Sequence, residues 1–118
     1  MSQPKASPNR FVGLDVHKHY LVAAAVDREQ NEVLRPRRVT LTRLDAWVHK
    51  TLTLQDAVVL EMTTNSFQLY DDLLPYVYSV TVIHPPHVAL ITRAQVMTDK
   101  IAARTLAKLH AVGLLPPV

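Results

Sequence analysis

Short apolar runs and polar turns alternate along the first forty residues. The run FVGLDVH at 11–17 predicts a buried strand, HYLVAAAV at 19–26 a second, and EVLRPRRVTL at 32–41 a third. A polar turn at 27–31 separates the last two. Pro36 places the third strand at a sheet edge, because proline cannot donate a ladder hydrogen bond. The three runs together predict an antiparallel meander.

Beyond residue 41, helical and strand periodicities alternate. Helices are predicted at 42–52, 66–74 and 98–112, with a short one after 84–87, and strands at 57–61 and 80–83. Trp47 is expected to anchor the core. Residues suited to helix ends flank these segments: Thr42 with Asp45, Asn65 or Ser66, Thr98 and Gly113. The order predicts an α/β fold, a mixed five-stranded sheet with helices on both faces.

Length and composition favour one domain, residues 10–118, behind a flexible tail at 1–9. The absence of cysteine excludes disulfides and thiolate metal sites. We see neither a membrane-spanning run nor a signal peptide, so a cytoplasmic location without membrane contact is expected. Residues 1–43 carry eight Lys/Arg against four Asp/Glu, residues 44–92 one against five, and residues 93–118 four against one. This basic–acidic–basic layout suits a protein that meets phosphate backbones, although an ordinary solvated surface accounts for it equally well.

Three acidic residues occupy positions suited to chemistry. Asp15 lies inside an apolar strand, on the face of Gly13 and His17 by strand alternation. Glu61 ends the strand AVVLE, and Asp99 lies in the first turn of the last helix. Each alone has a structural explanation, as a strand end or a favourable charge at a helix N-terminus. Together they could converge on hard cations such as Mg²⁺, which prefers oxygen ligands.

The blocks FVGLDVHK, VVLEMTT and TDKIAARTLAKLHAVGLLPPV resemble, in order and spacing, those of DEDD-type insertion-sequence transposases. That family includes the bridge-RNA-guided recombinases and the pilin-gene invertases, and the resemblance covers residues 11–118. It implies a RuvC-like N-terminal domain with a ribonuclease H fold. It also implies a Mg²⁺ (or Mn²⁺) site in which Asp15, Glu61 and Asp99 are metal ligands and catalytic residues.

Two departures from the family pattern bear on activity. The fourth carboxylate is expected three residues after Asp99, where this chain has Ala102, which cannot bind a metal. Family members are also two to three times longer and carry a serine nucleophile in a C-terminal domain. None of the local serines matches that block: Ser2, Ser7, Ser66 and Ser79. The chain is therefore expected to be a fragment, inactive in recombination by itself.

Further residues are candidates for nucleic-acid contact. Lys18 could bind phosphate and a neighbouring histidine could assist at the metal, or residues 17–19 could form a solvated turn. Arg35 and Arg37 are expected on one face of the third strand with Arg38 on the other, either gripping a backbone or protecting the sheet edge. Other candidates are Arg104 and Lys108 on the last helix, and Tyr20, Tyr76 and Tyr78 for stacking. His84 and His87 are interpreted as exposed loop residues rather than a metal pair.

Three functions follow from these features. The leading hypothesis is the metal-dependent domain of a transposase or site-specific recombinase, with DNA, a structured guide RNA and further copies of the full-length protein as expected partners. The alternative is a non-catalytic nucleic-acid-binding or dimerisation module on the same fold. A phosphotransferase related to actin and the sugar kinases is disfavoured, because residues 17–19 lack the Gly-rich phosphate turn.

Overall fold

The computed structural model describes residues 7–61, 66–83 and 99–114, except for the side chains of 99 and 100. Its strands are β1 (Arg10–Val16), β2 (Tyr20–Asp27), β3 (Glu32–Thr40), β4 (Asp56–Glu61) and β5 (Ser79–Ile83). Its α-helices are α1 (Leu44–Thr51), α2 (Ser66–Leu73) and α4 (Asp99–Ala111), and its 3-10 turns are η1 (Leu41–Arg43) and η2 (Leu74–Tyr76). None of the described helices is long and apolar enough to cross a membrane.

The five strands form one mixed sheet in the order β3-β2-β1-β4-β5. β1 and β3 both pair antiparallel with β2, which confirms the predicted meander, and β3 lies at the edge as Pro36 suggested. β4 pairs parallel with both β1 and β5. The carboxyl ends of β1, β4 and β5 therefore meet at one end of the sheet.

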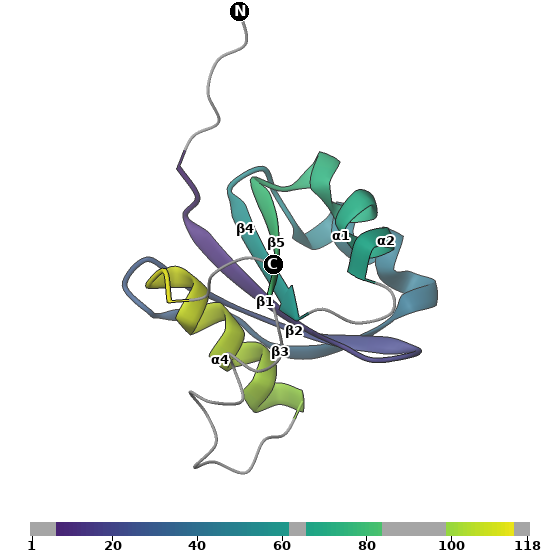
Figure 1. The fold of residues 1–118 in the computed structure, drawn as a ribbon, viewed down its shortest axis with the longest axis horizontal. Helices are drawn as coiled ribbons and strands as arrows, with labels where there is room; N and C mark the ends of the chain where they lie inside the picture. Colours follow the sequence, from purple (N-terminus) through teal and green to yellow (C-terminus); the bar gives the residue numbers. More distant parts are fainter. Residues whose placement is uncertain (1–6, 62–65, 84–98, 115–118) are drawn as a thin grey trace, which may run out of the picture.

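Helices cover both faces of the sheet, as expected (Figure 1). On one face, α1 and α2 pack over the larger core, in which Trp47 is buried as predicted. α4 covers the other face, where Ala103 packs on Val22 and Ala24 of β2, and Leu106 on Val59 and Ile83. Apolar side chains on both faces of the central strands explain why β2 reads as a continuous apolar run.

The ends of the helices differ in part from the predictions. Thr42 does not cap α1: the N-cap is Arg43 without a side-chain hydrogen bond, because η1 first turns the chain. Gly113 does end α4, with φ of 74°. Its N–H donates to the carbonyl of His110, and the N–H of Leu114 donates to that of Leu109, a Schellman motif. Asn65, Thr98 and the short helix expected after 84–87 lie outside the described residues.

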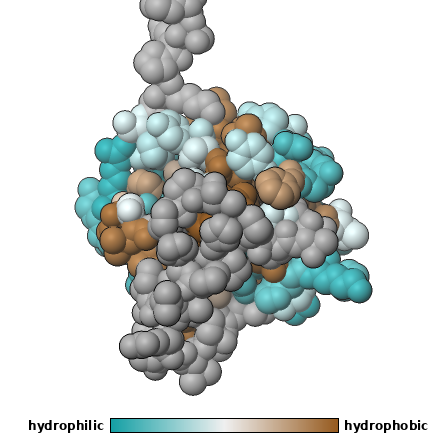
Figure 2. All heavy atoms as spheres, in the orientation of Figure 1, coloured by the Kyte–Doolittle hydropathy of each residue, from teal (hydrophilic) through white to brown (hydrophobic). Residues whose placement is uncertain are grey.

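On the face of the molecule shown in Figure 2, the rim is polar, and hydrophobic residues are visible over the C-terminal part of α4. Val112 and Leu114, just beyond α4, are 56% and 59% exposed. At the start of the sheet, the backbone N–H of Asn9 donates to the carbonyl of Gln55.

Candidate carboxylate site

Asp15 lies near the carboxyl end of β1, opposite Val22 of β2. Like Gly13, it belongs to the face of the sheet that α4 covers, as strand alternation predicted. Its side chain is 21% exposed, and its Oδ2 lies 2.7 Å from Nε2 of His17. The carboxylate is thus held by a neighbour and still reachable from solvent.

Gly13 allows α4 to approach this face closely. A Cβ at Gly13 would lie 2.2 Å from the carbonyl oxygen of Ala103 and 2.6 Å from the backbone nitrogen of Ala107. At the start of β1, the ring of Phe11 meets that of His110 edge to face at 5.9 Å. α4 therefore runs antiparallel to β1 and begins at the carboxyl end of the strand.

That direction places the first residue of α4 toward the Asp15 end of the sheet. Asp99 precedes Ala103 by four residues, roughly 6 Å along the helix. Asp15 follows Gly13 by two residues, roughly 7 Å along the strand. The backbone of Asp99 therefore lies at the level of Asp15, while its side chain lies outside the described part of the chain.

Glu61 is the last residue of β4, the parallel neighbour of β1. The register pairs Leu14 with Leu60, so Glu61 comes next to Asp15 at the same end and on the same face. Burial raises the pKa of Glu61, and the negative charge of Asp15 raises it further. A proton or a cation at this position would relieve the repulsion between the two carboxylates.

Two of the three predicted metal ligands have described side chains, Asp15 and Glu61. Among the described side chains, no three of His, Asp or Glu come together as a group that could hold a metal ion. Asp15 and Glu61 are neighbours, and the side chain of Asp99, the third predicted ligand, is not described. The side chain of Ala102 is a methyl group, which has no donor atom for a metal. The donor chemistry of two adjacent carboxylates nevertheless suits a divalent cation.

A row of stacked side chains leads away from Asp15 toward the sheet edge. The ring of His17 stacks on Tyr20 at 4.6 Å with an interplanar angle of 18°. Cζ of Arg38 lies 3.7 Å from the centroid of the same tyrosine ring. Sequence reasoning put Arg38 apart from Arg35 and Arg37 without connecting it to Asp15, because its pairing with Val22 depends on the β2–β3 register.

The other nucleic-acid candidates are spread over the surface. Lys18 is exposed in the β1–β2 turn, at the Asp15 end of the sheet. Arg104 is paired with Glu32 at 2.9 Å, and Lys108 is exposed farther along α4. Arg35 and Arg37 are exposed on β3, where a register shift interrupts the alternation from which a shared face was predicted. His84 and His87 lie outside the described residues.

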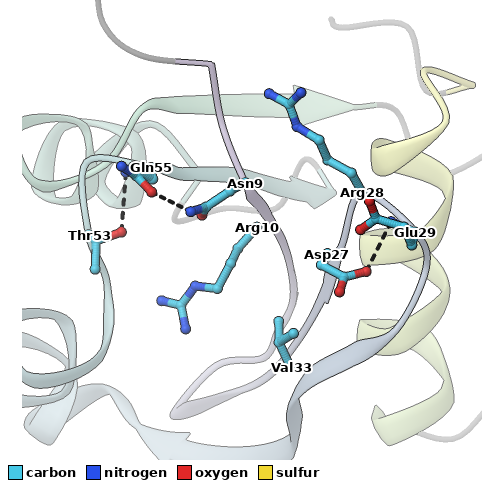
Figure 3. A pocket seen from close by; sticks show the side chains of 8 residues that line it. All are labelled: Asn9, Arg10, Asp27, Arg28, Glu29, Val33, Thr53 and Gln55. Atoms are coloured by element: carbon cyan, nitrogen blue, oxygen red, sulfur yellow. Dashed lines mark hydrogen bonds between the residues drawn. The ribbon is translucent and has the colours of Figure 1, made fainter.

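A surface pocket of about 550 Å³ lies at the opposite end of the sheet (Figure 3). The guanidinium of Arg28 points away from the carboxylates of Asp27 and Glu29 in this view. Arg10 donates from Nε to Oδ1 of Asp56 at 2.6 Å and from Nη2 to Oδ2 at 2.7 Å, so its side chain has a structural role. The lining residues are Asn9, Arg10, Asp27, Arg28, Glu29, Val33, Thr53 and Gln55. Because this pocket lies far from Asp15, it does not belong to the carboxylate site.

Comparison with solved structures identifies the fold. No protein-family model matches the sequence, and no curated protein sequence matches it. Among solved structures, one that is similar is T. thermophilus RuvC in complex with a Holliday junction substrate. The match has a TM-score of 0.51 and 16% identity, and covers 92% of this chain and 99% of that chain. The chain therefore has a RuvC-like, ribonuclease-H-like fold.

Proposed function

We propose that this chain is the metal-binding, DNA-cleaving domain of a transposase or site-specific recombinase. The observation that carries the proposal is the pair of carboxylates, Asp15 and Glu61, at adjacent parallel strand ends on one face. The three sequence blocks that resemble DEDD transposases support it. So does the RuvC-like fold, since that RuvC structure contains a Holliday junction substrate.

In this function Asp15 and Glu61 bind Mg²⁺ or Mn²⁺, with Asp99 as the third carboxylate. A divalent cation held there stabilises the negative charge that develops on a phosphodiester during cleavage. Lys18 is exposed at this end of the sheet and is suited to hold a DNA phosphate. The expected guide RNA and homo-oligomer are extensions of the same proposal.

A second candidate is a non-catalytic nucleic-acid-binding module on this fold. Ala102 favours it, because the fourth carboxylate of the family pattern is missing. Both candidates predict DNA binding, so affinity for DNA does not separate them. Metal binding does, because only the catalytic candidate needs a cation at Asp15.

Isothermal titration with Mn²⁺ tests the proposal. We expect the chain to bind Mn²⁺, and Asp15→Asn to weaken binding about tenfold or more. Asp45→Asn is the matched control, because that carboxylate is 88% exposed on α1 and should leave the affinity unchanged. If the chain bound no Mn²⁺, or if Asp15→Asn bound it as well as the parent chain, the binding-module candidate would replace the proposal.

Glu61→Gln adds a stability readout. Because the folded state raises the pKa of Glu61, its ionised form destabilises the metal-free fold increasingly as pH rises through that pKa. Glu61→Gln should therefore raise the melting temperature of the metal-free protein at pH 7.5. It should also reduce the further rise that Mn²⁺ gives the parent chain. A lower melting temperature without metal would contradict the described environment of Glu61.

A further inference from the structure

Asp15 and Arg38 lie in one row across three strands of the sheet. Asp15 of β1 pairs with Val22 of β2, and Val22 pairs with Arg38 of β3. Directly paired residues point to the same face of a sheet, so both side chains belong to the face on which α4 packs. Two strand spacings separate their backbones by roughly 10 Å. Arg37, next in sequence, pairs with Ala23 and therefore belongs to the opposite face.

The ring of Tyr20 holds the guanidinium of Arg38 in place. Cζ of Arg38 lies 3.7 Å from the centroid of this ring, within the range of a cation–π contact. Tyr20 is itself held, because it stacks on His17 at 4.6 Å and packs against the small core cluster beneath α4. A guanidinium has five N–H donors in one plane, which match the oxygens of a phosphate. Because Arg38 is ordered before any ligand arrives, binding costs it less side-chain entropy.

The charge of Arg38 is available to an anion from outside the fold. In the part of the chain that the structure describes, Arg38 has no carboxylate partner, whereas Arg10 and Arg104 are paired with acidic residues. Arg38 is also exposed to solvent. Asp15 and Glu61 make the centre of this end of the sheet negative, which repels phosphate, so a DNA strand crossing it needs cations beside the carboxylates. Arg38 provides one on the β3 side.

We propose that Arg38, held on Tyr20, binds a backbone phosphate of the DNA and so directs the strand across the sheet from β1 toward β3. The inference rests on the proposed function, because it takes Asp15 as the place where the strand is cleaved. The rings of His17 and Tyr20 lie between Asp15 and the guanidinium. The phosphate at Arg38 is therefore not the one at Asp15. At 3.4 Å per nucleotide, a separation of roughly 10 Å corresponds to about three nucleotides.

The salt dependence of DNA binding tests this contact, because each phosphate that a cation neutralises contributes about 0.9 to the slope of log K against log salt. Fluorescence anisotropy with a fluorescein-labelled DNA duplex measures K from about 50 to about 200 mM KCl. EDTA keeps divalent cations out of the measurement. Arg38→Gln should reduce the slope by about 0.9 and weaken binding about fivefold. Arg37→Gln, the matched control from the opposite face, should leave both unchanged.

Arg38→Lys separates the held guanidinium from its charge. Lysine keeps the charge, so the slope should stay at the parent value, but it lacks the planar donor set, so binding should weaken about threefold. Full affinity in Arg38→Lys would indicate a diffuse charge effect and overturn the inference.

The remaining outcomes separate this inference from the function on which it rests. If Arg38→Gln keeps the parent slope, Arg38 binds no phosphate, and the proposed function still stands on Mn²⁺ binding at Asp15. If Arg37→Gln lowers the slope as much as Arg38→Gln, net charge explains both losses and the inference fails. If the parent chain binds no DNA, both candidate functions fail and the inference fails with them.

Discussion

Replacing Gly13 with alanine tests how tightly α4 is packed on the sheet. Glycine in a strand costs conformational entropy, so where there is room Gly→Ala stabilises a protein by about 0.4–1 kcal/mol. Gly13 has no such room. The added methyl carbon would lie 2.2, 2.6 and 2.8 Å from the carbonyl oxygen of Ala103, the nitrogen of Ala107 and Cβ of Leu106.

The size of the expected loss follows from those contacts. The shortest one is about 1.2 Å below the 3.4 Å at which ordinary contacts begin, and two of the three atoms belong to the backbone. No side-chain rotation relieves them, so α4 itself must move outward. That movement opens the contacts of Ala103, Leu106 and Ala107, which are at most 1% exposed. We expect a loss of about 3 kcal/mol, at the upper end of typical overpacking costs.

Urea denaturation followed by circular dichroism measures this loss, and the chain supplies its own control. Its other glycine, Gly113, has nothing within 4 Å of the position that a Cβ would take, but has φ of 74°. Gly113→Ala should therefore cost only about 1 kcal/mol, from backbone strain. A Gly13→Ala protein as stable as the parent chain, or more stable, would refute the close packing of α4 on β1.

Two other substitutions test buried charge and burial of a histidine. Arg10→Met should lower the free energy of unfolding, measured by urea denaturation, by about 3 kcal/mol, because Asp56 is 0% exposed and would lose the cation that pairs with it. The control Arg37→Met, at an exposed position, should cost less than about 0.5 kcal/mol. Equal losses in the two variants would contradict a stabilising ion pair between Arg10 and Asp56. Burial lowers the pKa of His110, whose Nε2 has no hydrogen-bond partner in the described structure. As pH falls through about 6.5, the unfolded chain therefore binds more protons than the folded chain, and the folded state loses stability. His110→Leu should therefore reduce the loss of melting temperature between pH 7.5 and 5, and an unchanged loss would show that His110 is not buried.

The strands could be predicted because their signals are local. Apolar runs, the turn at 27–31 and Pro36 each reflect what a few consecutive residues can bury or hydrogen bond. The start of α1 could not be predicted, because the 3-10 turn η1 comes first and moves the N-cap to Arg43. The register shift between β2 and β3 could not be predicted either, because such an irregularity depends on the partner strand.

In the candidate site, too, some features could be predicted from the sequence and others depend on how the strands pair. The proximity of Asp15 and Glu61 was predicted from strand ends and family blocks, and the parallel β1–β4 register confirms that they are neighbours. The role of Asp99 as a metal ligand stays a prediction. The connection from Asp15 through His17 and Tyr20 to Arg38 was beyond sequence reasoning, because it depends on register and on ring orientations.

The parallel pairing of β1 with β4 also determines when the site can form during folding. The meander of β1, β2 and β3 joins residues close in sequence, whereas the β1–β4 pair joins residues 46 positions apart. Closing that longer loop costs more entropy and belongs to a later step. A chain that has folded only its meander contains Asp15 but lacks Glu61 beside it. Cation binding that requires both carboxylates would therefore report completion of the sheet.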